Sequence, residues 1–335
     1  MVLRPGPSFS VADVCRGWVN GLREAGCEVA DVNLDDRLTY FDLAEKALEL
    51  RAEEERFPAA ITMVAQTIRG DLFDFAPDVL VVVSGFFVPV QIYDLARARG
   101  IKVVLLNTES PYEDDRQLAR SSHVDVVVLN DPTNLDAFRA INPNSHYFPH
   151  CYDPAIHSPG PVEHADHVSD FVFVGTGYPS RREFFEKVDW SGIDAAFAGN
   201  WQGLDDSSPL APFLVNEKQF CLDNDDAVKL YRATKVSANL YRKETTALGT
   251  ADGWACGPRE VELAATGTFF LREPRGESDE LFGFLPTFTT PTEFEDLLRY
   301  FLDAPDERMA LAARARDAIG DRTFVNSAKR LLSLI

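Results

Sequence analysis

The chain has 335 residues, a length typical of two domains, and 45% of its residues are hydrophobic, enough to bury a core in each. Lysine and arginine total 33 against 53 aspartate and glutamate, so the formal net charge is −20 with histidines neutral. This balance argues against duplex nucleic acid as a partner, because binding to a phosphate backbone needs clustered cations. The net charge does not argue against small anions, such as nucleotides, as ligands.

The five cysteines are scattered and form no C-x-x-C pair, which predicts reduced thiols and a cytoplasmic protein. The opening "MVLRPGPSFS" has no long apolar core, so we expect no signal peptide. Apolar runs such as "VLVVVSGFFVPV" are interrupted by Gly and Pro and fall short of the roughly 18 residues of a membrane span. We therefore expect no membrane span.

In the first half, short β-branched runs alternate with helical patterns, which is typical of parallel βαβ units. Strands are predicted at Met1–Arg4, Glu28–Asn33, Asp78–Ser84, Lys102–Asn107 and Asp125–Asn130. Helices are predicted at Val11–Ala25, Leu43–Ile68, Val90–Arg99 and Thr133–Ile141. The runs "VLVVVS", "KVVLLN" and "DVVVLN" have the continuous apolar character of buried parallel strands, whose carboxyl ends are where such sheets bind ligands.

A proline-rich segment, residues 141–167, interrupts this alternation and is interpreted as an interdomain linker. Beyond it, strands are predicted at Asp170–Val174, Ile193–Ala198, Val236–Leu240 and Thr268–Leu271. Helices are predicted at Ser180–Val188, Asp225–Arg232, Pro258–Thr266, Thr292–Ala304 and Asp306–Ile319. We expect an α/β fold of two Rossmann-like domains facing a cleft. Its parts are residues 1–155, a hinge at 156–168, a second domain at 169–315 and a C-terminal helix at 316–335 that can cross back to the first domain.

The stretch "CGPREVELAATGTFF" places charged residues in the first turns of a predicted helix. Gly257 lets a ligand approach closely and Pro258 suits the first helical position. The free N–H groups of that helix end form an anion site, to which Arg259 adds a charge-assisted contact. Glu262, one turn later, can accept hydrogen bonds from a ribose diol. The same stretch is also compatible with an ordinary surface helix whose acidic residues lie near its positive end.

The stretch "FVFVGTGYPSRREFF" predicts a buried strand, a glycine-bearing turn and a helix that begins with two arginines. The turn can cradle a diphosphate through backbone N–H groups while an arginine neutralises it. As a motif, G-T-G is weak, and it is not the G-x-G-x-x-G of dinucleotide-binding folds. It gains weight from "ANLYR", which ends another predicted strand of the same half. The further residues predicted to bind the donor are Gly175, Thr176, Gly177, Arg181, Arg182, Asn239 and Arg242.

Four segments together resemble a known family: "DFVFVGTGYPSRREFF", "VSANLYR", "GPREVELAATGTFFL" and "DELFGFLPTFTTPTEFEDLLRYFLDAPDER". They are similar to the donor-binding domain of CgeB-like glycosyltransferases, which are GT-B enzymes related to the spore maturation protein CgeB. "NTESPYEDD" and "FPHCYDPAIHSP" resemble that family's first-domain and hinge segments, so the resemblance runs from about Val79 to Arg308. It implies a nucleotide-sugar donor held by the second domain, an acceptor met by the first, and no required metal.

By the same resemblance, Glu262 corresponds to the glutamate that binds the donor ribose, and Arg259 to the arginine before it. Many GT-B transferases have a second glutamate eight positions earlier that contacts the sugar. Trp254 stands there in this chain. How the sugar is held, and whether its anomeric configuration is retained, are therefore open.

An inverting transferase needs a base to take the proton of the acceptor hydroxyl. The candidates are Glu109 in "TESPYEDD", Asp13 after the first strand, and His150 in "FPHCYD". Each has a simpler interpretation: Glu109 as a turn residue before Pro111, Asp13 as an early-helix charge, and His150 as a packed hinge residue. Glu109 is preferred because it follows a buried strand and would face the cleft.

Two patterns resemble metal sites but do not predict one. His146, His150, His157, His164 and His167 lie in the proline-rich segment at spacings that fit no known ligand pattern. "DNDD", Asp223–Asp226, resembles the D-x-D of metal-dependent glycosyltransferases, but it directly precedes a helical pattern. We interpret Asp223–Asp225 as helix caps.

The sequence thus predicts a metal-independent glycosyltransferase that uses a UDP- or GDP-linked sugar and no other cofactor. The acceptor is a protein, a glycan or a small molecule, and the sequence does not fix the oligomeric state. A sugar-nucleotide epimerase or hydrolase on the same fold, and a non-catalytic nucleotide-binding protein, are the alternatives. A dinucleotide oxidoreductase ranks last, because the first strand is followed by "PGPSFS" and not by a glycine fingerprint.

Overall fold

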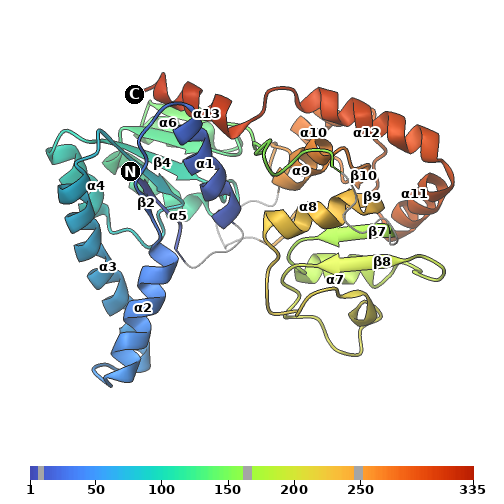
Figure 1. Cartoon of the computed structure of the whole chain (residues 1–335), viewed down its shortest axis with the longest axis horizontal. Coiled ribbons are helices and arrows are strands. Elements are labelled where there is room, and N and C mark those ends of the chain that lie inside the picture. The colour runs from blue at the N-terminus through green and yellow to red at the C-terminus, as the bar shows by residue number, and fades with distance from the viewer. Residues whose placement is uncertain (7–10, 161–167, 245–251) are drawn as a thin grey trace. The chain divides into compact units, whose positions relative to one another are not determined.

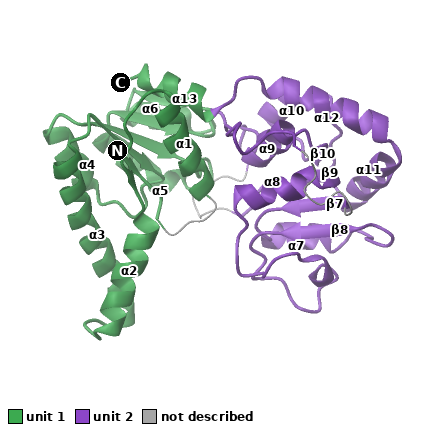
Figure 2. Cartoon of the chain, in the orientation of Figure 1, with its two compact units in different colours: residues 1–148, 246–250, 324–335 green, residues 149–245, 251–323 purple. Residues whose placement is uncertain are grey.

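The computed structural model describes residues 1–6, 11–160, 168–244 and 252–335 (Figure 1). The chain divides into two compact units, shown in green and purple in Figure 2. Unit 1 contains the described residues up to Phe148 together with Phe324–Ile335. Unit 2 contains the described residues between Pro149 and Thr323.

Unit 1 is built on a parallel sheet of six strands in the order β2-β1-β3-β4-β5-β6. The strands are β1 Val2–Leu3, β2 Asp31–Val32, β3 Val79–Val83, β4 Lys102–Asn107, β5 Val126–Leu129 and β6 Ser145–Tyr147. The first five were predicted. The edge strand β6 was not, because "SHY" carries none of the apolar character that marks a buried strand.

The helices of unit 1 are α1 Ala12–Glu24, α2 Leu34–Ala47, α3 Glu53–Phe75, α4 Val90–Ala98, α5 Asp114–Leu118, η2 Ala119–His123, α6 Leu135–Ile141 and α13 Phe324–Leu332. The single helix predicted at Leu43–Ile68 is wrong, because the chain breaks there into α2 and α3. Helix α2 begins at Leu34, nine residues before the predicted start at Leu43. Asn33 caps it, because its side-chain oxygen accepts the Asp35 N–H at 3.0 Å. Glu49, in the break, has a positive φ of 50°, which an α-helix does not allow.

The C-terminal helix α13 packs on α1 of unit 1. The Phe324 ring lies 6.2 Å from the Trp18 ring, and a Cβ on Gly17 would lie 2.2 Å from it. The expected return of the C-terminal helix to the first domain is thereby confirmed. The unit boundary lies at residue 324 and not at 316, because a division at 316 would cut through the continuous helix α12, Pro305–Ile319.

Unit 2 is built on a parallel sheet of four strands in the order β10-β9-β7-β8. The strands are β7 Ser169–Val174, β8 Ala195–Ala198, β9 Thr234–Asn239 and β10 Phe270–Arg272. Its helices are α7 Pro179–Phe185, η3 Ala211–Phe213, α8 Asn224–Arg232, α9 Pro258–Thr266, α10 Gly276–Phe282, α11 Pro291–Asp303 and α12. All four strands lie where the sequence predicts them, whereas α10, a short helix rich in polar residues, was not predicted.

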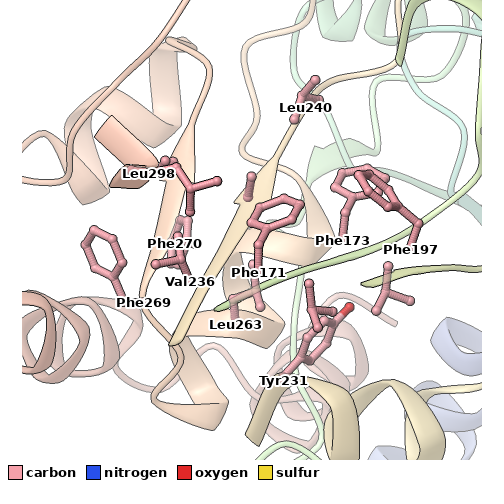
Figure 3. Packing of buried hydrophobic residues seen from close by; sticks show 14 of the residues in the cluster. Phe171, Phe173, Phe197, Tyr231, Val236, Leu240, Leu263, Phe269, Phe270 and Leu298 are labelled. Carbon is pink, nitrogen blue, oxygen red and sulfur yellow. The ribbon is translucent and has the colours of Figure 1, made fainter. Parts of the chain in front are cut away.

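Aromatic side chains fill the core of unit 2 (Figure 3). Phe171 and Phe173 of β7 each contact both Phe185 of α7 and Phe197 of β8. The Phe173 and Phe185 ring centroids are 4.9 Å apart. Such tilted and edge-to-face contacts fix the orientation of the rings. The core therefore holds the carboxyl ends of the strands, where the predicted donor residues lie, on a rigid base.

Residues 149–160 belong to unit 2. The Tyr152 N–H donates to the Arg322 carbonyl at 2.9 Å, and the Arg232 guanidinium donates to the Ser158 carbonyl at 2.6 and 2.9 Å. These bonds explain why the boundary between the units lies at 148/149 and not at the expected residue 155. The expected hinge, 156–168, lies partly outside the described residues, as do His164 and His167.

Candidate functional site

The start of α9 lies against the end of β9. Gly257 precedes the helix, and a Cβ there would lie 3.4 Å from both side-chain polar atoms of Asn239. Asn239 is 5% exposed, and its Nδ2 has no hydrogen-bond partner within the described protein. A buried amide donor that is not bonded within the protein, beside the positive end of a helix, forms a site for a polar or anionic ligand.

Glu260, in the first turn of α9, is the centre of a buried network. Its carboxylate accepts hydrogen bonds from the Gly257 N–H at 2.8 Å, the Tyr241 hydroxyl at 2.5 Å and the Ser278 hydroxyl at 2.6 Å. Burial raises the pKa of Glu260, and these three donors partly offset that effect. The residue ties the helix start to the loop after β9 and to α10. Glu260 was not among the predicted site residues, although its position three residues after Gly257 is the capping-box position.

In the same helix, Arg259 forms an ion pair with Glu262, which lies three residues later. Arg259 Nη1 donates to Glu262 Oε2 at 2.7 Å and also to the Tyr231 hydroxyl. Glu262 is 8% exposed, and its Oε1 lies 3.5 Å from Asn224 Nδ2 at the start of α8. Here Arg259 orients the carboxylate, and its expected contact with a phosphate stays a prediction. Asn224 and Tyr231 were not predicted, because they reach this pair from another helix.

The glycine turn after β7 is tightly bonded to its surroundings. The Gly175 N–H donates to the Ala198 carbonyl at 2.9 Å, and the Gly177 N–H donates to the Asn200 carbonyl at 2.8 Å. A Cβ on Gly177 would lie 2.4 Å from the Trp201 ring, so packing alone requires this glycine. The two glycine N–H groups expected to cradle a diphosphate are thus used within the protein. Binding by this turn, Thr176 included, stays a prediction.

Arg181 joins the loops that follow β7 and β9. Its guanidinium donates to the Thr176 carbonyl at 3.0 Å and to the Leu240 carbonyl at 3.1 Å. Arg242, from the second of these loops, lies 5.2 Å from the Tyr178 ring centroid, as Arg181 does. Arg181 and Arg242 therefore both lie beside the Tyr178 ring, and their predicted binding to the donor stays a prediction. Arg182 packs instead toward Gly203.

The start of α7 carries a carboxylate of the protein itself. Glu244 accepts from the Ser180 N–H at 2.9 Å and from the Ser180 hydroxyl at 3.2 Å. Burial acts to raise the pKa of Glu244, but these hydrogen bonds outweigh it and lower the pKa. Because this carboxylate takes the place of an anion at α7, the start of α9 is the better candidate for the donor phosphates.

The three candidate bases lie in different places. Asp13, in the first turn of α1, pairs with Arg16 at 2.8 Å. Glu109 follows β4, and its carbonyl accepts the Glu113 N–H at 3.1 Å. His150 falls in unit 2, two residues beyond the unit boundary. The catalytic role of each stays a prediction.

The acidic run at the start of α8 caps that helix. Asp223 is the N-cap residue, and its Oδ1 accepts the Asp226 N–H at 3.0 Å, while Asp226 pairs with Lys229 at 3.0 Å. Within the parts of the chain that the structure describes, no three His, Cys, Asp or Glu side chains are grouped to hold a metal ion. All five cysteines are free thiols. No helix in the described ranges has the length and apolar character needed to cross a membrane.

Comparison with known proteins decides the class of this domain. Residues 181–333 match the model of the family described as glycosyl transferase-like. The chain carries a glycosyltransferase domain. The matched residues contain Arg259, Glu262 and Asn239, so the start of α9 and the end of β9 lie inside this domain. The predicted enzyme class, glycosyltransferase, is confirmed. No curated protein is similar enough in sequence to match this chain.

Several solved structures share the fold at 10–12% identity. Anabaena HepE in complex with UDP-glucose has a TM-score of 0.61 and 12% identity, with 100% of this chain and 99% of that chain covered. A trehalose-6-phosphate structure from E. coli bound with UDP-2-fluoro glucose has a TM-score of 0.58 and 11% identity, covering 99% and 97%. Sucrose-phosphate synthase from Thermosynechococcus elongatus has a TM-score of 0.57 and 10% identity, covering 84% and 80%. The expected α/β fold with two parallel-sheet domains of GT-B type is confirmed.

Proposed function

We propose that this glycosyltransferase takes its sugar from a UDP- or GDP-linked donor bound by unit 2 and transfers it to an acceptor hydroxyl. The acceptor class is a protein, a glycan or a small molecule. The observation that carries the proposal is the start of α9, inside the glycosyl transferase-like match. There Glu262 is held in one orientation by Arg259, and Asn239 presents an unbonded amide. Structures of similar fold that bind UDP or UDP-glucose support UDP as the first donor to test.

Each part of this site has a distinct task in the proposed reaction. Glu262 accepts hydrogen bonds from the two ribose hydroxyls, because hydrogen bonds to a carboxylate are shorter and stronger than those to a neutral acceptor. Negative charge builds on the diphosphate as the bond to the sugar breaks. The positive end of α9 and the Asn239 amide stabilise this charge in the transition state more than in the ground state, and so accelerate transfer. Glu109 is our first choice for the base that deprotonates the acceptor.

We also propose that the chain belongs to the CgeB-like group and that it is located in the cytoplasm. The absence of a disulfide among its five cysteines supports the proposed location. Trp254 distinguishes this chain from transferases with a sugar-binding glutamate at that position. A Cβ on Gly276 would lie 2.3 Å from the Trp254 indole, and the Trp254 carbonyl accepts the Glu277 N–H at 2.8 Å. Trp254 therefore packs against the start of α10, and another residue holds the sugar in this proposal.

The first experiment is the titration of UDP and GDP into the Glu262→Ala variant. Loss of the charged hydrogen bonds to the ribose is expected to weaken binding of the better nucleotide by about 1–3 kcal/mol, roughly 5- to 150-fold in Kd. Glu280→Ala is the matched control, because Glu280 is an exposed glutamate of α10. Equal affinity of the Glu262→Ala variant and the wild-type protein would refute the assignment of Glu262.

Transfer is further proposed to proceed without a divalent metal. The D-x-D-like run supports this, because Asp223 and Asp226 are used to cap and pair within α8. Excess EDTA is therefore expected to leave the transfer rate within about twofold of its value with Mg²⁺. A complete loss of activity that Mn²⁺ or Mg²⁺ restores would contradict this proposal and return attention to Asp223–Asp226.

A further inference from the structure

His157 lies in a tight turn of the segment 149–160 and is 3% exposed. The backbone N–H of Asp153 donates to His157 Nδ1 at 3.3 Å. The backbone N–H of His157 donates to the Asp153 carbonyl at 2.7 Å. The Asp153 side chain accepts the Ala155 N–H at 2.9 Å, which closes the turn. The bond to Nδ1 orients the imidazole ring within this turn.

The bond to Asp153 also fixes the tautomer of His157. Because Nδ1 accepts a hydrogen bond, the proton of the neutral ring is on Nε2. Burial lowers the pKa of His157, so the ring is neutral at neutral pH. His157 Nε2 is buried and has no hydrogen-bond partner within the described protein. A buried donor without a partner is costly, so we expect an acceptor to come within its reach in another state of the site.

The surroundings of His157 indicate which acceptor that is. The charges of Glu262 and Arg259 both act on the His157 ring, with Glu262 favouring a proton there and Arg259 opposing it. Arg232, at the end of α8, binds the Ser158 carbonyl next to His157, and a Cβ on Gly267, at the end of α9, would lie 3.6 Å from Pro159. The segment of His157 is thus held against α8 and against α9, the helix that carries Glu262. The ring therefore belongs to the same neighbourhood as the Glu262 carboxylate.

Glu262 has unused capacity for such a donor. A carboxylate offers about four acceptor positions. One Glu262 oxygen accepts from Arg259 at 2.7 Å, and the other has the long contact of 3.5 Å with Asn224. A ribose diol that binds this carboxylate in place of the long Asn224 contact leaves room for one further donor from the protein.

We propose that His157 is a positioning residue of the donor site, whose Nε2–H donates to the Glu262 carboxylate when the nucleotide is bound and so orients it toward the ribose. This inference rests on the proposed function, because it takes Glu262 as the ribose acceptor. It gives the hinge-like segment "CYDPAIHSP" a role in the donor site. His157 moves no proton in the reaction.

Three variants separate this role from simple packing. His157→Gln keeps an amide N–H near the Nε2 position, His157→Asn keeps an acceptor near Nδ1, and His157→Phe keeps only the ring shape. UDP and GDP affinities are measured by calorimetry, and the donor KM and kcat by transfer kinetics. His123→Phe, at a histidine of unit 1 paired with Asp94, is the matched control.

The expected result is a Kd weakened about tenfold in His157→Phe and His157→Asn, the effect of one hydrogen bond to a charged group, and a value within about threefold of wild type in His157→Gln. The donor KM rises in parallel while kcat stays near the wild-type value. Unchanged affinity in His157→Phe, with nucleotide binding by the wild-type protein intact, overturns the role of His157 and leaves the proposed function standing. Failure of the wild-type protein to bind UDP or GDP overturns both.

A spectroscopic measurement tests the same inference without activity. The ¹⁵N chemical shifts of the His157 ring in the free protein are expected to be those of the Nε2–H tautomer. Saturation with UDP is expected to shift the Nε2 resonance, as a new hydrogen bond does. A ring protonated on Nδ1, or an Nε2 resonance that does not change in the presence of bound UDP, overturns the inference.

Discussion

The carboxyl ends of the two sheets differ in how their buried polar groups are used. In unit 2, the charged side chains Glu260, Arg181 and Glu244 are each bonded to backbone groups of a neighbouring loop or helix. In unit 1, the amides of Asn107 and Gln117 are 2% and 0% exposed, and neither has a hydrogen-bond partner among the described residues. The region around α9 is tied together by charged groups and leaves only the donor of the Asn239 amide unbonded among its described amides, whereas unit 1 leaves both polar atoms of two neutral amides unbonded.

This difference shows which part of the fold is held more rigidly. A buried carboxylate that accepts three donors stays in place only if all three donors stay too, so the loops around α9 form one unit of structure. Unit 1 also has a bonded group, in which Asp114 accepts from Ser110 at 2.5 Å and from Asn134 at 2.9 Å. The amides of Asn107 and Gln117 lie outside that group. The comparison predicts opposite effects for substitutions in the two regions.

The largest effect is expected for Glu260→Ala in unit 2. It leaves the Gly257 N–H and the hydroxyls of Tyr241 and Ser278 without their acceptor. We expect a loss of about 3 kcal/mol in the free energy of unfolding, and a Tm lower by about 6–12 °C for a unit of this size. Calorimetric melting checks this, with Glu280→Ala as the control. A Tm within about 2 °C of wild type would show that the network does not hold the region together.

A smaller effect of opposite sign is expected for Asn107→Val in unit 1. A buried amide without partners costs free energy, and a β-branched apolar residue suits the carboxyl end of a buried strand. We expect the free energy of unfolding to rise by about 1 kcal/mol, measured by thermal or denaturant unfolding. A decrease in stability would mean that the Asn107 amide is bonded in solution, and the contrast between the two regions would fail.

Much of the fold could be predicted from the sequence because its strands are buried on both faces. Continuous apolar runs such as those of β3 and β4 have no other common explanation in a soluble domain. Elements that were missed, such as β6, α5 and α10, are short and polar, so they form through contacts with the rest of the fold. The break between α2 and α3 was missed because it depends on a cap at Asn33 and a positive φ at Glu49.

The candidate site was predicted in part for a similar reason. Gly257, Arg259 and Glu262 belong to one local stretch, so their pattern is visible in the sequence. The groups that hold them are distant in the chain: Tyr231 bonds to Arg259 across 28 positions, and Asn224 contacts Glu262 across 38. No local pattern encodes such pairs. The use of the Gly175 and Gly177 N–H groups by neighbouring carbonyls could likewise not be read from "GTG".

The central claim is that the start of α9 binds the diphosphate and the ribose of an activated sugar. A crystal structure of the protein soaked with UDP tests it most directly. We predict the ribose hydroxyls within hydrogen-bond distance of Glu262 and the diphosphate beside Gly257 and Asn239. Nucleotide bound elsewhere in unit 2, with the Arg259–Glu262 pair unchanged and no ligand at Asn239, would contradict the account.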